Sequence, residues 1–301
     1  MKILITGGMG FIGKHLARLL LEEGHEITIL DNLNNGQKAE NLSRIKFVKG
    51  DVRDAKLIED VSNDKDIICH LAALANIRKS IENPDYCFTT NVVGTFNVLE
   101  AAKKNNVKKV IFSSSREVYG NAPAFPVKES CRIMPYNLYG ATKACSEHLC
   151  NVYRQEHGLN ITIFRLANVY GAGDEVEGRV IPTFIKNINN NEIIAINGGE
   201  QILDFVWIDD VTRILAEAIK EYDNETINIG SGRGTTILEL AELMKDISGR
   251  DVKIAIKPPI KQEVKKFIAD ISRIGISPFP LEKGLRILLN NALEGNNGKS
   301  I

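Results

Sequence analysis

Short apolar runs alternate with longer amphipathic stretches over the first half of the chain. The runs are rich in Val, Ile and Leu and predict strands over Lys2–Thr6, Glu26–Leu30, Lys46–Val48, Asp66–Leu71, Lys108–Ser113 and Asn160–Arg165. The stretches between them include predicted helices over Phe11–Glu23, Tyr86–Asn105 and Tyr139–His157. Apolar strands separated by helix-length segments indicate a parallel sheet covered on both faces. The pattern therefore predicts an α/β fold with a doubly wound parallel sheet.

The rhythm is looser after Ala167. It predicts helices near Ile181–Asn190, Asp210–Glu221, Thr236–Ser248 and Leu281–Leu293, and strands at Ile193–Ile196, Phe205–Ile208 and Thr226–Gly230. We expect residues 1–166 to form the sheet domain, with returns to it near 204–230. Residues 167–203 and 231–294 would then form a smaller, interleaved C-terminal α/β lobe, and residues 295–301 a flexible tail.

Composition and charge narrow the possible partners. The 301 residues contain 38 Lys and Arg against 38 Asp and Glu, and the resulting zero net charge argues against a nucleic-acid or membrane partner. The five cysteines contain no C-x-x-C pair, which predicts neither a disulfide framework nor a metal site. A strand begins directly after Met1, and no apolar run reaches the roughly 20 residues of a membrane span. We therefore expect a cytoplasmic protein.

A glycine-rich loop follows the first predicted strand and leads into a helix. Glycines at 7, 10 and 13 form a G-x-x-G-x-x-G motif. Gly7 permits a tight turn, Gly10 lets the backbone approach a pyrophosphate, and Gly13 lets the helix pack closely on the strand. Because the helix N-terminus presents free N–H groups, the loop predicts a Rossmann-type dinucleotide site.

Acidic residues end the second and third predicted strands. Asp31 is placed to accept hydrogen bonds from an adenosine ribose, and its charge would repel a 2′-phosphate, which favours NAD over NADP. Asp51 and Val52 follow the third strand. They are placed to contact the adenine, although Asp51 could equally be an ordinary acid at a strand end.

Candidate catalytic residues lie further along the chain. Tyr139 and Lys143 are four residues apart and share one helix face. We expect the Lys143 ammonium, together with the charge on an oxidised nicotinamide, to lower the pKa of the Tyr139 phenol, which would make it a base or acid near neutral pH. The alternative is a solvated pair. Ser113 to Ser115 end the fifth strand, at the sheet edge where ligands bind, and can share a hydrogen bond with a substrate oxygen.

Several further motifs resemble one family. The chain is similar over nearly its full length to extended short-chain dehydrogenases/reductases of the NAD-dependent nucleotide-sugar epimerase/dehydratase family, in the motifs TGGMGFIG (6–13), HLAA (70–73), NVVGT (91–95), SSSREVYG (113–120), YGATK (139–143), RLANVYG (165–171), DFVWIDDV (204–211) and NIGSG (228–232). The resemblance implies NAD as cofactor and a nucleotide sugar, with a UDP-sugar favoured, as substrate.

The resemblance also implies roles for single residues. Those expected to bind the cofactor are Gly7, Gly10, Phe11, Ile12, Gly13, Asp31, Asn32, Asp51, Val52, Leu71, Ala72, Ala73, Asn91, Ser113, Tyr139, Lys143 and Leu166. The matching catalytic trio is Ser115, Tyr139 and Lys143. Those expected to bind the substrate are Ser115, Glu117, Asn168, Arg179, Val180 and Asn197. We interpret Arg165 as a buried ion-pair arginine rather than a substrate contact.

Members of this family oxidise the sugar at C4 and differ in the fate of the 4-keto sugar. Dehydratases have an Asp-Glu pair where this chain has Arg116 and Glu117, so the missing aspartate disfavours dehydration. Glu117 keeps decarboxylation possible, or it pairs with a nearby base. We place 4-epimerisation of a UDP-hexose through a transient 4-keto sugar first. Decarboxylation, dehydration, 4-oxidation and a non-catalytic NAD-binding scaffold are the alternatives.

The substrate side departs from the family pattern. Leu203 stands where members that bind UDP-sugars usually have arginine, and a second expected arginine is absent from 257–263. Losing two guanidinium groups removes bidentate phosphate contacts. Lys257, Lys261, Lys265 or Arg179 could replace them as point charges, and Asn197 replaces an aromatic residue. The resemblance further implies a homodimer formed through the helices at Tyr86–Asn105 and Tyr139–His157.

Overall fold

Seven parallel strands form the central sheet, in the order β10-β6-β5-β4-β1-β2-β3. The computed structural model describes residues 1–34, 44–174, 178–259 and 264–297, without the side chains of 294–297. The strands are β1 Lys2–Thr6, β2 Glu26–Asp31, β3 Ile45–Lys49, β4 Ile67–His70, β5 Lys109–Ser115, β6 Ile161–Leu166 and β10 Thr226–Ile229. The six strands predicted for the first half are present within two residues, and the doubly wound sheet is confirmed.

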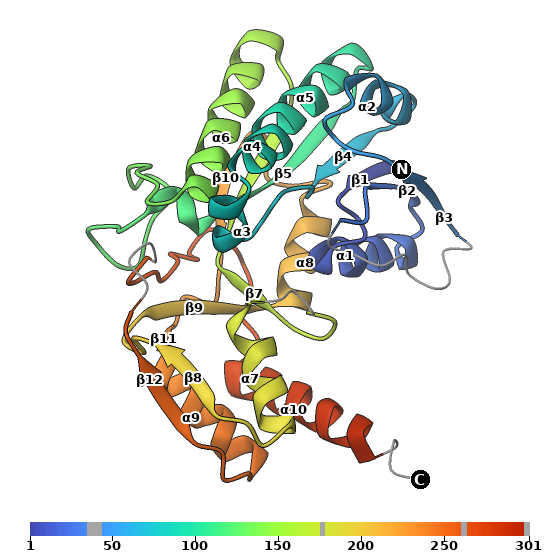
Figure 1. Cartoon of the computed structure of the whole chain (residues 1–301). Helices are drawn as coiled ribbons and strands as arrows, with labels where there is room; N and C mark the ends of the chain where they lie inside the picture. Colours follow the sequence, from blue (N-terminus) through green and yellow to red (C-terminus); the bar gives the residue numbers. More distant parts are fainter. Residues whose placement is uncertain (35–43, 175–177, 260–263, 298–301) are drawn as a thin grey trace.

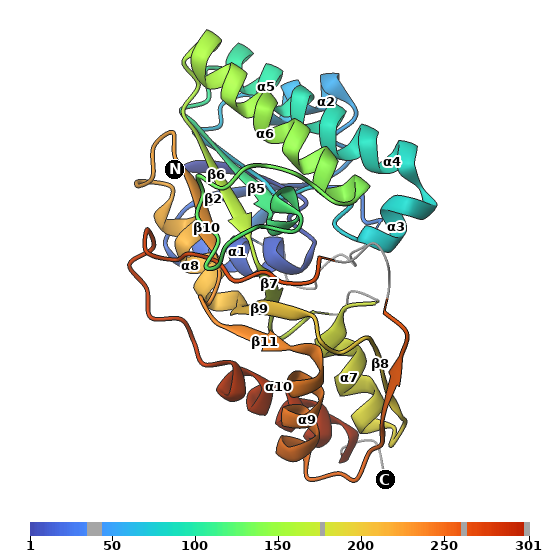
Figure 2. The ribbon, with the colours of Figure 1, turned by 90° about the vertical axis from the view of Figure 1, so that its left-hand side faces the viewer.

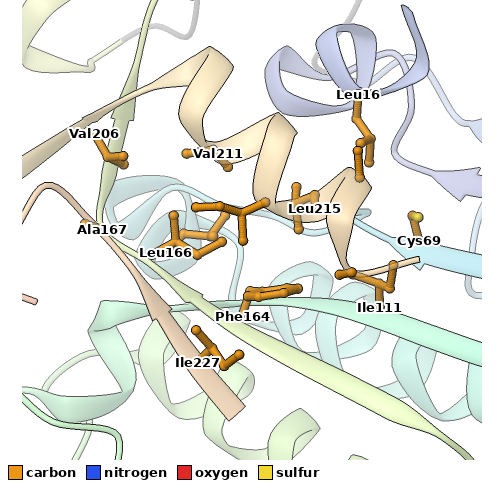
Figure 3. Close-up of a cluster of buried hydrophobic side chains, with 14 of the residues drawn as sticks. Leu16, Cys69, Ile111, Phe164, Leu166, Ala167, Val206, Val211, Leu215 and Ile227 are labelled. Atoms are coloured by element: carbon orange, nitrogen blue, oxygen red, sulfur yellow. The ribbon is translucent and has the colours of Figure 1, made fainter. Parts of the chain in front are cut away.

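Helices cover both faces of this sheet (Figure 1). On one face lie α1 Phe11–Glu22 and α8 Ile208–Glu217; on the other lie α2 Ala55–Ser62, α5 Gly94–Lys104 and α6 Leu138–His157. Alternate residues of each strand serve the two faces, as Ile3 and Ile5 pack with α1 while Leu4 packs with α5. Figure 3 shows Leu16 of α1 and Leu215 of α8 over the sheet residues Ile111 and Phe164.

The predicted helix over Tyr86–Asn105 is divided. It consists of α4 Pro84–Phe88, a π-helical segment η1 Thr89–Val93, and α5, and a short helix α3 Ile77–Glu82 precedes it. Within η1 the Asn91 carbonyl oxygen accepts hydrogen bonds from two side-chain hydroxyls, Ser146 at 2.9 Å and Thr95 at 2.5 Å. Side-chain partners of this kind compete with the regular helix ladder, and π-turns occur often beside functional sites.

In the residues that the structure describes, the second lobe contains two small sheets and three helices. Figure 2 shows them below the central sheet. The first sheet has the order β11-β9-β7, and the second pairs β8 with β12. The elements are β7 Asn168–Tyr170, β8 Ile194–Asn197, β9 Ile202–Trp207, β11 Gly234–Thr236, β12 Ile254–Lys257, α7 Val180–Asn189, α9 Ile237–Ser248 and α10 Leu281–Asn297. The hydrophobic pattern does not predict β7, β11 and β12 because three or four residues carry too little periodicity. Helix α10 continues four residues past its predicted end.

The chain passes between the lobes more than once. After β9 it enters α8, which packs on α1 of the large lobe, and β10 then pairs in parallel with β6, with Ile227 beside Phe164. Residues after β10 return to the small lobe (Figure 1). The carboxyl ends of the central strands, where ligands of such sheets bind, therefore face segments of the small lobe.

No helix in the described ranges is long and apolar enough to cross a bilayer.

Candidate active site

Three glycines allow the tight loop between β1 and α1. Gly7 has φ of 69°, and a Cβ there would lie 2.7 Å from the Ala72 backbone. A Cβ on Gly13 would lie 2.5 Å from the Gly7 carbonyl oxygen. Gly10 is the N-cap of α1 and offers no side-chain cap, and the first turn holds no acidic residue. A bare backbone at the positive end of α1 fits a dinucleotide pyrophosphate, with Phe11 and Ile12 in that first turn.

Asp31 fastens the glycine loop to the end of β2. Its Oδ2 accepts a hydrogen bond from the Met9 N–H at 2.9 Å, and its Oδ1 accepts one from the Leu33 N–H at 2.8 Å. A carboxylate has about four acceptor sites, so Asp31 retains capacity for two further donors. This arrangement fits the predicted contact with ribose hydroxyls.

Asn32 connects three elements beside that site. Its Nδ2 donates to Asp51 Oδ2 at 2.8 Å and to the Tyr86 hydroxyl at 3.1 Å. Arg53 pairs with Asp51 at 2.9 Å and lies 4.6 Å above the Tyr86 ring. Burial acts to raise the pKa of Asp51, but hydrogen bonds from Arg53 and Asn32 outweigh it and lower the pKa to about 2. Sequence reasoning missed Tyr86 and Arg53, since no local pattern relates α4 to the end of β3.

Val52 and the run Leu71–Ala73 are further predicted cofactor residues. Val52 is buried and lies under Gly94, where a Cβ would come within 2.6 Å of Val52 Cγ2. The half-buried run Leu71–Ala73 starts beside the glycine loop, with the Leu71 N–H donating to the Thr6 carbonyl at 3.1 Å. These apolar residues lie at the carboxyl ends of β3 and β4.

Asn91 is buried between this run and α6. Its Oδ1 accepts a hydrogen bond from the Leu74 N–H at 2.8 Å, and its Nδ2 donates to Thr142 Oγ1 at 2.9 Å. Its side chain therefore ties the Leu71–Ala73 run to the helix that carries Tyr139 and Lys143. A direct cofactor contact by Asn91 stays a prediction.

The three catalytic candidates meet where β5 ends beside α6. Ser115 lies close enough to the Tyr139 hydroxyl to act on its pKa. Lys143 Nζ donates to the Ser113 carbonyl oxygen at 2.6 Å and lies 4.8 Å above the Phe112 ring. Only 3% of Lys143 is exposed, which rules out the alternative of a solvated pair. On the neighbouring strand, Leu166 is in register with Ser115.

The pKa values of Tyr139 and Lys143 are both shifted by burial in the chain by itself. Burial raises the pKa of Tyr139 to about 12, and the negative charge of Glu117 adds to the rise. The Ser115 hydrogen bond and the Arg179 charge act in the opposite direction but are weaker. In the chain by itself the phenol pKa is therefore raised, because desolvation outweighs the nearby cations. The lowering expected from Lys143 together with an oxidised nicotinamide stays a prediction. Burial lowers the pKa of Lys143 itself to about 8.

Glu117 is engaged by two protein groups. Its Oε1 pairs with Arg116 Nη2 at 2.9 Å, and its Oε2 accepts a hydrogen bond from Asn137 Nδ2 at 2.7 Å. Its backbone N–H donates to Ser115 Oγ at 3.2 Å, which starts the 3-10 segment η2 Arg116–Tyr119. The structure thus shows Glu117 paired with a nearby base, one of the two alternatives predicted for it.

Arg165 is a structural ion-pair residue, as interpreted from the sequence. It is buried, and its guanidinium bonds both carboxylate oxygens of Glu147, with Nη2–Oε2 at 2.7 Å. Its Nη1 donates to the Tyr119 hydroxyl at 2.9 Å and to the Glu129 carbonyl oxygen at 2.9 Å. These contacts satisfy the guanidinium within the protein.

The remaining predicted substrate residues lie at α7, β7 and β8. Arg179 lies near Tyr139, pairs with Asp174 at 3.1 Å and lies 5.6 Å from the Phe11 ring, and Val180 after it begins α7. Asn168 starts β7 and donates to the Asp204 carbonyl at 3.0 Å. Asn197 is exposed at the end of β8, in register with Lys257 of β12, and its contact with the substrate stays a prediction.

The positions that lack the family's arginines are filled differently. Leu203 packs against the hydrophobic cluster of the small lobe, which explains an apolar residue at that position. Lys257 and Lys265 are exposed, and Lys261 lies outside the described residues. Among the candidate cations in the described part of the chain, Arg179 is the one whose charge acts on Tyr139.

The cysteines are thiols in this structure. Cys69, Cys87 and Cys150 are buried, Cys131 is half-buried and Cys145 is exposed. Within the described ranges, no group of three or more His, Cys, Asp or Glu side chains is arranged to hold a metal ion.

The chain matches a known family and its solved structures. The family model described as the NAD dependent epimerase/dehydratase family matches residues 3–230. A putative UDP-glucose 4-epimerase of Methanocaldococcus jannaschii is 36% identical over 297 residues, which cover 96% of this chain and 97% of that protein.

Two crystal structures share the whole fold. The UDP-glucose 4-epimerase of Thermotoga maritima with UDP-glucose is 36% identical, with a TM-score of 0.93 and coverage of 99% of this chain and 100% of that chain. The UDP-glucose 4-epimerase of Thermus thermophilus in complex with NAD is 27% identical, with a TM-score of 0.91 and full coverage of both chains.

Proposed function

We propose that this chain, which belongs to the NAD dependent epimerase/dehydratase family, is a nucleotide-sugar 4-epimerase working through a transient 4-keto sugar. The observation that carries the proposal is the junction of β5 and α6, where Ser115 lies beside Tyr139 and a buried Lys143 lies one turn away. A scaffold that only binds NAD has no need of this arrangement. The similar proteins of M. jannaschii and T. maritima, which are named as UDP-glucose 4-epimerases, support a UDP-hexose as substrate.

The residues divide the work between binding and proton transfer. The glycine loop and Asp31 bind and orient NAD, which when bound supplies an acceptor and donor for the C4 hydride. Tyr139 takes the C4 hydroxyl proton during oxidation and returns it during reduction, while Ser115 shares a hydrogen bond with the same oxygen. Because burial raises the pKa of Tyr139 to about 12, the chain by itself keeps this phenol protonated at neutral pH. Positive charge beside it in the complex must lower that value before it can act as a base.

The state of Glu117 favours epimerisation over the other outcomes. A carboxylate that moves a proton on the 4-keto sugar needs an oxygen that faces the sugar. Both oxygens of Glu117 are engaged, one by Arg116 and one by Asn137. These contacts hold Glu117 to the protein and disfavour it as the acid or base of a dehydration or decarboxylation.

The test is direct. Purified protein with NAD is incubated with UDP-glucose, UDP-galactose and their N-acetyl, GDP and dTDP counterparts, and the C4 configuration is followed by NMR. We expect interconversion of at least one UDP pair and none with Tyr139→Phe, which should still bind NAD. If every hexose stays unchanged at C4, the proposal fails. Carbon dioxide from UDP-glucuronate would instead identify a decarboxylase, and accumulating NADH a 4-dehydrogenase.

We also propose Arg179 as the cation nearest to the substrate. It lies between Tyr139 and the glycine loop, at the N-terminus of α7, where free N–H groups favour anions. Arg179→Gln should raise KM for the nucleotide sugar while leaving NAD affinity unchanged. An unchanged KM would remove Arg179 from the substrate site.

A homodimer and a cytoplasmic location complete the proposal. Exposed apolar side chains lie along the outer helices: Phe88 of α4, Val93 of η1, Phe96 of α5 and Val152 of α6. Such side chains gathered on adjacent helices are typical of an interface between copies of a chain. The cytoplasmic location stays a prediction, supported by the five cysteine thiols.

A further inference from the structure

A chain of contacts joins Arg116 to the start of helix α6, which carries Tyr139. Arg116 Nη2 pairs with Glu117 Oε1 at 2.9 Å, and Asn137 Nδ2 donates to Glu117 Oε2 at 2.7 Å. The pair is buried, with 10% of the Arg116 side chain and 4% of the Glu117 side chain exposed.

Asn137 connects Glu117 to the backbone of α6. It is the N-cap residue, and its Oδ1 accepts a hydrogen bond from the Gly140 N–H at 2.9 Å. Since the Asn137 amide nitrogen is held by Glu117, its oxygen is oriented toward the helix. The first turn also packs directly on η2, because a Cβ on Gly140 would lie 2.5 Å from the Glu117 carbonyl oxygen. Tyr139 lies within this turn.

Arg116 is held by Glu117 and by an aromatic ring. Its guanidinium carbon lies 5.8 Å from the centre of the Phe267 ring, which in turn stacks on Tyr119. Arg116 Nη1 is buried without a hydrogen-bond partner in the described part of the chain. A buried N–H left unpaired costs stability. The hydrogen bonds of Arg116 are therefore not all satisfied, and its main interaction is the ion pair with Glu117.

We propose that Arg116 and Glu117 are positioning residues for Tyr139: Glu117 orients the Asn137 cap of α6, and Arg116 opposes the Glu117 charge beside the phenol. The proposal rests on the proposed role of Tyr139 in proton transfer. It explains why a family position occupied by an acid in dehydratases holds an arginine here. A second carboxylate would add negative charge next to the phenol, whereas arginine neutralises the one already present.

The charged and titratable groups around Tyr139 define what such a pair can change. Glu117 faces it from η2, Arg179 from the start of α7 and Cys87 from α4, while Lys143 lies one turn along α6. Glu117 and Cys87 act to raise the phenol pKa, and Arg179 acts to lower it. Removing one member of the Arg116–Glu117 pair exposes the charge of the other. The two single substitutions must therefore shift Tyr139 in opposite directions.

The test compares Arg116→Gln, Glu117→Gln and the double variant in the full chain with NAD added. The protein is labelled with ¹³Cζ-tyrosine, and the Tyr139 signal is assigned with Tyr139→Phe. At one fixed alkaline pH, Glu117→Gln should raise the ratio of ionised to protonated Tyr139 by about tenfold, and Arg116→Gln should lower it by about tenfold. The double variant, which keeps the pair neutral, should return close to the wild-type ratio.

The cap is tested separately with Asn137→Ser. Serine can still cap α6 but cannot donate to Glu117 as the amide does. We expect an unchanged melting temperature, an unchanged KM and a kcat reduced about tenfold or more, because Tyr139 is misplaced by a fraction of an ångström. Asn137→Ala, which removes both contacts, should lower kcat and the melting temperature together.

The outcomes separate this proposal from the proposed function. If both single variants leave the Tyr139 ionisation unchanged, or shift it in the same direction, or if Asn137→Ser retains wild-type kcat, the positioning proposal is overturned. If the wild-type protein changes no nucleotide hexose, the epimerase function fails, while the NMR comparison still decides whether the pair sets the ionisation of Tyr139.

Discussion

The guanidinium of Arg165 and the carboxylate of Glu147 form a buried ion pair, with Nη2 and Oε2 2.7 Å apart and both side chains almost inaccessible. The pair ties β6 to α6, the helix that carries Tyr139 and Lys143. Ser114 of β5 donates a further hydrogen bond to Glu147 at 2.5 Å. The strand end and the catalytic helix are therefore held together by charge inside the protein, behind the site.

Replacing Arg165 by methionine should destabilise the protein strongly. The substitution leaves the Glu147 carboxylate buried without its cation, which typically costs about 3–5 kcal/mol. The free energy of unfolding in urea measures this loss. The double variant Arg165→Met, Glu147→Gln removes the unpaired charge and should recover part of the stability. Equal stability of the single and double variants would contradict the assigned role of the ion pair.

His70 makes the stability pH-dependent. Its imidazole lies between the hydroxyls of Thr6 at 2.7 Å and Thr95 at 3.0 Å, and burial lowers its pKa from 6.5 to about 3, with a contribution from the charge of Lys143. Between pH 6.5 and pH 3, His70 binds a proton in the unfolded chain but not in the folded chain. This contribution to stability is therefore complete above pH 6.5 and is lost as the pH falls toward 3, with a slope approaching 1.4 kcal/mol per pH unit, about one proton.

The variant His70→Gln isolates this contribution. Other groups also titrate between pH 3 and 6.5, so the informative quantity is the wild-type slope minus the slope of the variant, measured by urea unfolding at several pH values. We expect the wild type to lose more stability on acidification than His70→Gln. Parallel curves would show that His70 is not kept neutral by the fold.

Gly13→Ala should abolish NAD binding or weaken it by at least a hundredfold. The new Cβ would lie 2.5 Å from the Gly7 carbonyl oxygen, a distance that forces the loop apart. The matched control is Gly275→Ala, because no atom lies within 4 Å of a Cβ built there. Calorimetric titration with NAD measures both. Wild-type affinity in Gly13→Ala would mean that the glycine loop is not the pyrophosphate site.

The double variant Phe96→Glu, Val152→Glu should convert a dimer into monomers. These side chains are 44% and 41% exposed on the neighbouring helices α5 and α6, and two charges per copy would be buried in the proposed interface. Ile256→Glu is the control, since Ile256 is exposed in the small lobe on β12. Sedimentation velocity reports the mass. A wild-type protein that sediments as a monomer would remove the proposed interface.

The sequence alone predicted the central sheet and the residue types of the site. Strands β1 to β6 are short segments rich in Ile, Val, Leu and Phe. The glycine spacing, the acid that ends β2 and the Tyr139–Lys143 spacing are local features of the sequence, which do not depend on how the chain packs. The small-lobe strands β7, β11 and β12 were not predicted, because they are short and stabilised by partners distant in the sequence. The π-helical turn at Asn91 was missed for the same reason, since its hydrogen-bond partners come from α6.

What the sequence by itself determined is the chemistry available: a glycine cradle, an acid for a ribose, and a serine, a tyrosine and a lysine at the correct spacing. What only the tertiary structure decided is the charge state and the pairing of those groups. In the chain by itself, burial raises the pKa of Tyr139, and Glu117 is a partner of Arg116 and Asn137. Both depend on desolvation and on charges brought together from separate segments, and neither quantity exists until the chain has folded.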